Sequence, residues 1–104
     1  MSGPLPQPHR EELDLPSVLH ALSDPVRLNI VRELYASQAE QSCGSFEAPV
    51  SKSTLTHHFR VLREAGVTAQ RQCGTSRLTT IRTEDLESRF PGVLESIVSA
   101  SLPA

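Results

Sequence analysis

The spacing of the apolar residues changes abruptly at Gly66. Before this glycine, apolar side chains recur every three or four residues, as on one face of an α-helix. After it, residues 67–72 and 77–82 form two β-compatible stretches around Cys73-Gly74-Thr75-Ser76, which indicates a β-hairpin with Gly74 in its turn. A chain of 104 residues has the length of one domain. The sequence therefore predicts a single α+β domain that is mainly helical and carries one hairpin.

Two helices are expected in the first forty residues. A short helix runs from Leu13, with apolar residues at helical spacing. Ser23-Asp24-Pro25 ends this helix and starts another, because Asp24 can accept free backbone N–H groups and Pro25 suits the first helical position. The second helix carries an apolar stripe wide enough for burial on more than one side, and it should fade near residues 36–39.

A third helix is expected over residues 52–65, with Ser51 as its N-cap and Gly66 as its C-cap. Its apolar side chains share one face, which should point inward: Leu55, Phe59 and Leu62. The opposite face is polar and should point outward: Lys52, Ser53, Thr56, His57, Arg60 and Arg63. His58 lies on the flank, where we expect it to pack and to form a hydrogen bond.

Prolines interrupt the two remaining segments. In residues 40–50, Gly44 and Pro49 limit any helix to about one or two turns. After the hairpin, Thr83 is expected to cap a last helical region, which Pro91 interrupts or restarts.

Charge is distributed unevenly along the chain. The formal net charge is −2, but residues 52–82 contain six Lys or Arg residues and one Glu, and so carry +5. The rest of the chain carries −7. A basic segment on an acidic body is typical of a small nucleic-acid-binding protein that presents one face to phosphates.

This order of helices followed by a basic hairpin is that of a winged helix-turn-helix domain. The third helix would enter the major groove, which is about 12 Å wide and admits an α-helix. The hairpin would be the wing, with Arg71 and Arg77 available to phosphates or to the minor groove. The alternative is a winged-helix module that binds another protein. The salt dependence of binding distinguishes the two hypotheses. Only for DNA should the logarithm of the binding constant fall with the logarithm of the salt concentration, by a slope of about 0.9 for each phosphate that the protein neutralises.

Two sequence motifs indicate a family. Residues 21–30 read ALSDPVRLNI, and residues 50–67 read VSKSTLTHHFRVLREAGV. They resemble the opening motif, L(S/A)DPxRLxIL, and the recognition-helix motif, (L/V)SxSxxSxHLxxLxxAGL, of the ArsR/SmtB family of bacterial transcriptional repressors. The hairpin from Gly74 to Leu78 is also similar. The resemblance spans about residues 13–100, which we interpret as one DNA-binding and dimerisation domain that follows a flexible N-terminal arm, residues 1–12.

The resemblance implies a homodimer that binds an imperfect inverted repeat in double-stranded operator DNA and represses by occluding the promoter. Motif positions put the base contacts at Lys52, Ser53, Thr56 and His57, and the outward spacing adds Arg60. Family dimers pair through their first and last helices. The apolar residues of those helices are therefore expected at the dimer interface: Leu15, Val18, Leu19, Leu94, Ile97 and Val98.

The chain departs from the metal-sensing patterns of this family. Metal sensors often carry Cys-x-Cys before the recognition helix, whereas this chain has Ser42-Cys43-Gly44. Another family site uses a histidine on the last helix, and residues 83–100 contain none. Because tetrahedral metal sites need three or four ligands, we predict no metal or other cofactor, and the effector is unknown. A thiol- or metal-responsive repressor that uses Cys43 remains an alternative, with Cys73 expected in an exposed turn.

Other classes of protein lack their sequence signatures here. The chain contains no GxxxxGK[ST], GxGxxG, HExxH or GxSxG spacing, so we do not expect an enzyme. No apolar run approaches the roughly 20 residues of a membrane helix, and the first ten residues do not form a signal peptide. Two cysteines do not make a disulfide scaffold, which favours a cytoplasmic protein. The family resemblance implies a bacterial one, and we expect no membrane partner.

Overall fold

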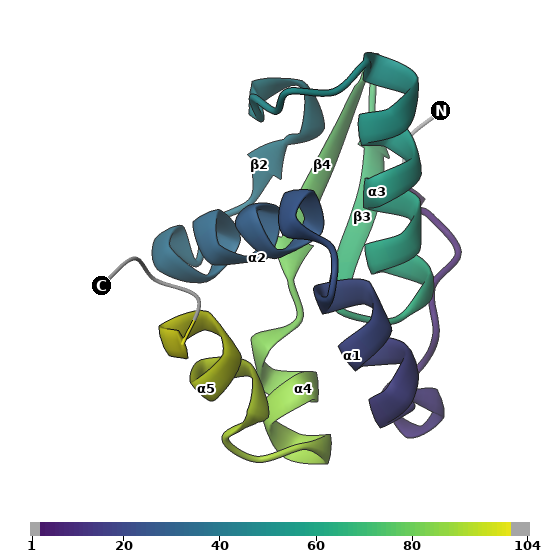
Figure 1. Ribbon diagram of the computed structural model, residues 1–104. Helices are drawn as coiled ribbons and strands as arrows, with labels where there is room; N and C mark the ends of the chain where they lie inside the picture. The colour runs from purple at the N-terminus through teal and green to yellow at the C-terminus, as the bar shows by residue number, and fades with distance from the viewer. Residues whose placement is uncertain (1–2, 101–104) are drawn as a thin grey trace.

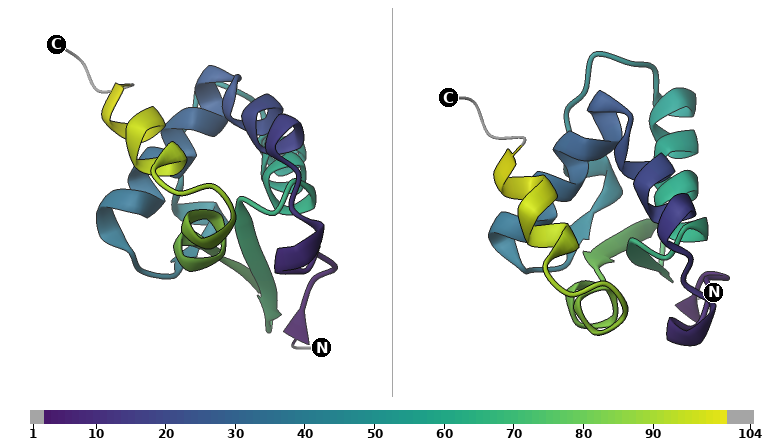
Figure 2. Two further views of the ribbon diagram at one scale, coloured as in Figure 1. Left: turned by 90° about the horizontal axis from the view of Figure 1, so that it is seen from below. Right: turned by 60° about the horizontal axis from the view of Figure 1, so that its bottom comes forward.

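A small antiparallel sheet packs against helices in the computed structural model, which describes residues 3–100 (Figure 1). Helices α2 and α3 contact strands β4 and β3, while α5 lies beside α2 and α1 lies beside α3 (Figure 2). The helices are α1 (Leu15–Leu22), α2 (Pro25–Ser37), α3 (Lys52–Glu64), α4 (Thr83–Arg89) and α5 (Val93–Ala100). The strands are β1 (Gly3–Pro4), β2 (Gln41–Ser42), β3 (Thr68–Cys73) and β4 (Ser76–Ile81), and two 3-10 turns are η1 (Arg10–Glu12) and η2 (Cys43–Ser45).

Aspartate side chains start the first two helices. Asp14 accepts a hydrogen bond from Ser17 N at 3.0 Å and caps α1, which therefore begins two residues after Leu13. Asp24 accepts from the backbone nitrogens of Val26 and Arg27 at 2.9 and 3.1 Å, and Pro25 occupies the first position of α2. The predicted capping of α2 is confirmed.

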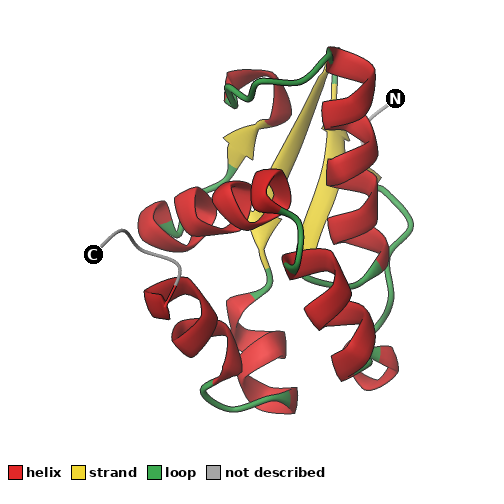
Figure 3. Ribbon diagram, in the orientation of Figure 1, coloured by secondary structure: helices red, strands yellow, loops and turns green. Residues whose placement is uncertain are grey.

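The predicted hairpin is present, and its sheet is wider than expected. β3 pairs with β4 from Thr68 opposite Ile81 to Cys73 opposite Ser76, and Gly74 enters the turn with a φ of 60° (Figure 3). Two-residue strands extend the hairpin on both sides, giving the order β1-β3-β4-β2. Residues 40–50 therefore contribute β2 and one 3-10 turn, which is within the limit of one or two helical turns expected from the sequence.

The predicted cap of the last helical region is wrong. Thr83 is the first residue of α4, and its hydroxyl donates to Gln38 Oε1 at 3.2 Å instead of capping the helix. The residue before α4 is Arg82, whose side chain reaches forward to Asp85. The predicted interruption at Pro91 is confirmed, because α4 ends before it and α5 begins after it.

One aliphatic core joins all the helices. Leu34, Leu62 and Leu86, from α2, α3 and α4, are almost completely buried, and each such side chain stabilises the fold by about 1.5–3 kcal/mol. The rings of Phe46 and Phe59 pack edge to face with their centroids 5.3 Å apart, which joins the η2 segment to α3. The core thus fixes α3 against the rest of the domain.

Candidate nucleic-acid interface

Helix α3 presents a polar face to solvent. The side chains predicted to contact bases are all exposed: Lys52, Ser53, Thr56, His57 and Arg60. Phe59 and Leu62 are buried on the opposite face, and Leu55 is half-buried. Ser51 caps the helix by accepting from Thr54 N at 3.2 Å. The core and the cap therefore hold this helix with its polar face outward.

Two contacts on α3 orient its polar side chains. Thr56 Oγ1 donates to Lys52 O at 2.9 Å, and Arg60 Nη2 lies 3.0 Å from His57 Nδ1. An arginine can only donate, so His57 Nδ1 is the acceptor and carries no proton. In the neutral ring the proton is then on Nε2, which can donate to an acceptor on a base edge.

The neighbouring histidine faces the interior, as expected. His58 is 8% exposed, and its Nδ1 lies 3.0 Å from Nη1 of Arg27, itself 8% exposed. Arg27 Nε also donates to Ala21 O at 2.7 Å. One buried guanidinium thus ties the end of α1 to α2 and to α3. The sequence motif contains Arg27, but nothing in its spacing indicated these partners.

Asp24, the cap of α2, lies close to the buried histidine: its Oδ2 is 3.8 Å from His58 Nδ1. Partial burial alone would raise the pKa of the Asp24 carboxyl. The hydrogen bonds from the backbone nitrogens of Arg27 and Val26, together with the positive charge of the Arg27 guanidinium, outweigh this effect and hold the pKa of Asp24 below its usual value. The cap of α2 and the buried arginine therefore belong to one charged cluster.

Arg63 differs from the exposed polar residues of α3, because its side chain is half-buried. Its Nε donates to Pro6 O at 3.1 Å, and its Nη1 donates to Gln70 Oε1 at 2.7 Å. Burial, with the charge of Arg77 nearby, lowers the pKa of Arg63. The prediction that Arg63 points freely outward is wrong, because the side chain anchors α3 to β3 and to the N-terminus.

The two arginines of the wing have different surroundings. Arg71 forms a bidentate ion pair with Glu40, with both N–O distances at 2.8 Å, which raises the pKa of Arg71 and lowers that of Glu40. Arg77 is exposed, and its Nε donates to the neutral side chain of Gln72 at 3.2 Å. Within residues 3–100, Arg77 has no carboxylate partner, so its full charge faces solvent.

The first residues of the chain lie along the hairpin as an N-terminal strap, residues 3–12. β1 pairs with β3, and Leu5 N donates to Gln70 O at 2.9 Å. Arg82 Nη1 donates to Pro8 O at 2.7 Å. The strap is the segment predicted as a flexible arm; it has defined contacts in this structure, and its flexibility in solution remains a prediction.

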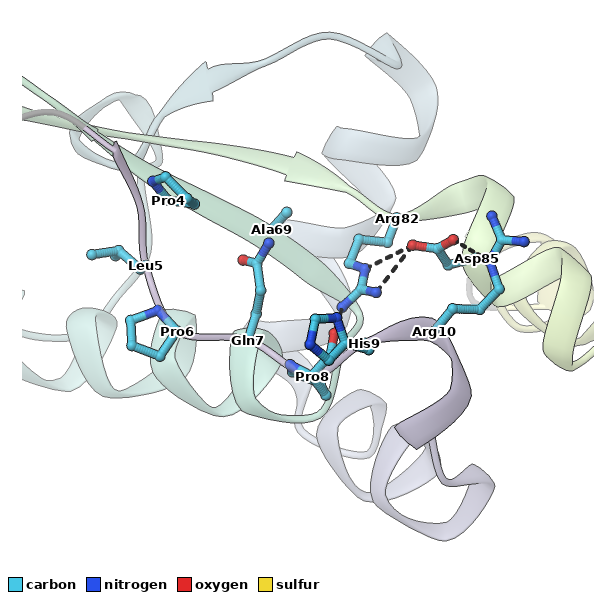
Figure 4. Close-up of a pocket in the computed structure, with 10 residues that line it drawn as sticks. All are labelled: Pro4, Leu5, Pro6, Gln7, Pro8, His9, Arg10, Ala69, Arg82 and Asp85. Carbon is cyan, nitrogen blue, oxygen red and sulfur yellow. Dashed lines mark hydrogen bonds and ion pairs between the residues drawn. The ribbon is translucent and has the colours of Figure 1, made fainter.

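Three charged side chains lie at the C-terminal end of the strap, beside a cavity of about 770 Å³. Figure 4 shows Arg10 and Arg82 converging on Asp85, with Nε–O distances of 2.6 and 3.1 Å. Burial raises the pKa of Asp85, but the hydrogen bonds from both arginines outweigh it and hold that pKa below its usual value. Both arginines pair with Asp85, and Arg10 belongs to the strap, so the cluster joins the strap to α4.

The six residues predicted for dimer contacts differ in exposure. Leu15 and Leu19 on α1 are 36% and 44% exposed, and Ile97 on α5 is half-buried. Val18, Leu94 and Val98 are buried in the core of the single chain. Only the first three therefore present apolar surface that a second copy can cover.

The two cysteines also lie in different environments. Cys43 is half-buried, and its Sγ accepts from Gln70 Nε2 at 3.1 Å; burial raises the pKa of this thiol. Cys73 is exposed beside the hairpin turn. Among residues 3–100, no group of three or more His, Cys, Asp or Glu side chains is arranged to hold a metal ion.

Comparison with known proteins identifies the family. Residues 22–71 match the family model of a helix-turn-helix domain. The chain is 39% identical over 82 residues to YceK of Bacillus subtilis strain 168, an uncharacterized HTH-type transcriptional regulator, and the match covers 77% of this chain and 82% of the relative. The chain belongs to the helix-turn-helix transcriptional regulators.

Solved structures share the fold of this regulator. The transcriptional repressor BigR from Xylella fastidiosa superposes with a TM-score of 0.65 at 24% identity, over 86% of this chain and 88% of that one. An ArsR family transcriptional regulator gives a TM-score of 0.63 at 18% identity, over 94% and 100%. The winged helix-turn-helix fold predicted from the sequence is confirmed, and one of the structures that share it is an ArsR family regulator, the family that the motifs resemble.

The regulator is therefore a DNA-binding transcriptional regulator, as predicted, and its family and fold point to regulation and not to an enzyme. In the part of the chain that the structure describes, no helix has both the length and the apolar character needed to cross a membrane.

Proposed function

We propose that the regulator binds an inverted-repeat operator as a homodimer in the cytoplasm and represses transcription by occluding the promoter. The observation that carries the proposal is the exposed polar face of α3, held outward by its core contacts and its cap. Lys52, Ser53, Thr56, His57 and Arg60 are the proposed base readers. Arg77 is the proposed main phosphate contact of the wing. Arg71 is proposed as a secondary contact, because Glu40 already neutralises it.

Fluorescence anisotropy with a duplex from upstream of the regulator's own gene tests the DNA proposal. We expect tighter binding to this duplex than to a scrambled one, with affinity falling steeply as salt rises. Arg77→Gln should weaken binding to both duplexes alike and reduce the salt slope by about 1. His57→Ala should instead change base preference, by about 1–3 kcal/mol at one position.

Two control variants test the roles assigned to Arg77 and His57. Arg71→Gln removes the same charge from the wing but should weaken binding less than Arg77→Gln, because its charge is paired. Arg89→Gln removes an exposed arginine of α4 and should leave binding unchanged. If Arg77→Gln altered base preference while His57→Ala weakened all sequences equally, the roles given to the two residues would be wrong. Equal, weak binding of both duplexes would overturn operator recognition.

The dimer proposal rests on the exposed leucines of α1. Leu15 and Leu19 place apolar side chains on one helix face, and Ile97 of α5 adds a half-buried one. We expect Leu19→Asp to convert a dimer into a monomer in analytical ultracentrifugation, because a carboxylate would be desolvated in the interface. Thr75→Asp, at the exposed hairpin turn, carries the same charge and should remain dimeric. A Leu19→Asp protein that stays dimeric would exclude this surface.

A further inference from the structure

A second cavity, of about 320 Å³, lies between α2 and the loop of residues 46–49. Val26 and Ile30 of α2 form one apolar wall, and Phe46 and Ala48 of the loop form the other. Volumes of this size are typical of small-molecule sites, which combine apolar walls with a few polar groups. The cavity is separate from the outward face of α3.

The distinctive polar group of this cavity is Arg32. Its Nε is buried and has no hydrogen-bond partner within residues 3–100. Its guanidinium also forms no ion pair there. A buried donor on a permanent cation is costly when it lacks an acceptor. The other arginines that line cavities, Arg10 and Arg82, have Asp85 as a partner.

We propose that this cavity binds a small monoanionic carboxylate with an apolar body. The planar guanidinium of Arg32 lines the cavity and matches a carboxylate, whose oxygens would accept from its terminal nitrogens and neutralise its charge. The apolar body would pack against Ile30 and Phe46, and the Asn29 amide, also at the cavity, adds a donor. Glu47 lies at the same cavity and is exposed, so it disfavours a ligand with further negative charge, such as a phosphate.

The position of the cavity relates it to α3. The loop that forms its second wall leads within two residues to Ser51, the cap of α3. A molecule in the cavity would therefore contact both α2 and the segment that starts the reading helix. The binding site itself goes beyond operator recognition and can be tested without DNA.

Isothermal titration calorimetry with four carboxylates tests the proposal: butanoate, hexanoate, octanoate and phenylacetate, each compared with its neutral amide. We expect saturable binding of at least one carboxylate and binding of its amide weakened by about tenfold or more, the loss expected for a charged hydrogen bond. Arg32→Gln should show a similar loss. Ala48→Trp, which fills the cavity and keeps Arg32, should abolish binding, while Arg89→Gln should bind as the unaltered protein does.

Three results would overturn the proposal. The first is the absence of saturable binding for all four carboxylates. The second is equal carboxylate affinity in the unaltered protein, Arg32→Gln and Ala48→Trp. The third is a failure of carboxylates to bind together with a salt slope of DNA binding that Arg32→Gln reduces by about 1. This result would mean that Arg32 contacts a DNA phosphate and not a carboxylate.

Discussion

Replacement of Arg27 by methionine is expected to lower the free energy of unfolding by about 3 kcal/mol, since it removes charged hydrogen bonds and leaves buried acceptors unsatisfied. The acceptors are Ala21 O and His58 Nδ1, at 2.7 and 3.0 Å from the guanidinium. For a domain of this length the loss corresponds to roughly 15 °C in the melting temperature. Urea denaturation followed by circular dichroism measures it directly.

The chain contains its own control for this experiment. Arg60 also donates to a histidine Nδ1 at 3.0 Å, but both of these side chains are exposed. Arg60→Met should change the stability by less than about 0.5 kcal/mol, as is usual for surface substitutions. A double-mutant cycle of Arg27→Met with His58→Leu should show coupling, because the second change removes one orphaned acceptor. Similar losses in Arg27→Met and Arg60→Met would mean that burial does not strengthen the Arg27 contacts.

The second large effect is expected at Gly66, where the chain turns from α3 into β3. Its φ is +84°, a region that disfavours side chains, and a Cβ at this position would overlap Leu13 Cδ2 and lie 3.2 Å from Pro8 Cγ. Gly66→Ala should therefore add a steric clash to the backbone strain, and we expect a loss of about 3 kcal/mol or more. The midpoint of urea denaturation measures this loss.

Gly92→Ala separates the clash from the strain. Gly92 has a φ of +79°, but no atom lies within 4 Å of the position that a Cβ would take there, so only strain of about 1 kcal/mol is expected. Shortening the obstructing side chain should also relieve the clash, so that Gly66→Ala combined with Leu13→Ala costs less than the sum of the two changes. Equal losses in Gly66→Ala and Gly92→Ala would show that the approach of Leu13 is unimportant.

The helices could be predicted from the sequence because their start and stop signals are local. Asp24, Pro25 and Ser51 act through backbone groups within three residues. The strands β1 and β2 could not be predicted, because two residues carry no periodicity and form a strand only by pairing with the hairpin. The error at Thr83 has the same origin, since its hydroxyl bonds to Gln38, 45 residues away.

Helical spacing predicted which residues of the candidate site are exposed, but it did not predict their distant partners. Helical spacing correctly separated the exposed His57 from the buried His58. It gave the wrong environment for Arg63, whose partner Pro6 is 57 residues away. Spacing also identifies an apolar face without showing what covers it. For this reason Leu94 and Leu19 received the same prediction, although one is buried in the core and the other is exposed.

The order β1-β3-β4-β2 has a consequence for the solubility of the protein. A hairpin alone would expose two strand edges, and an unpaired edge is a template for pairing with another chain. Here β1 covers the outer edge of β3 opposite Arg71 and Gln72, and β2 covers that of β4 opposite Leu78 and Thr79. The new edge at β1 contains Pro4, whose nitrogen has no hydrogen to donate. Removal of residues 1–12 would therefore uncover a sheet edge and expose the protein to edge-to-edge aggregation.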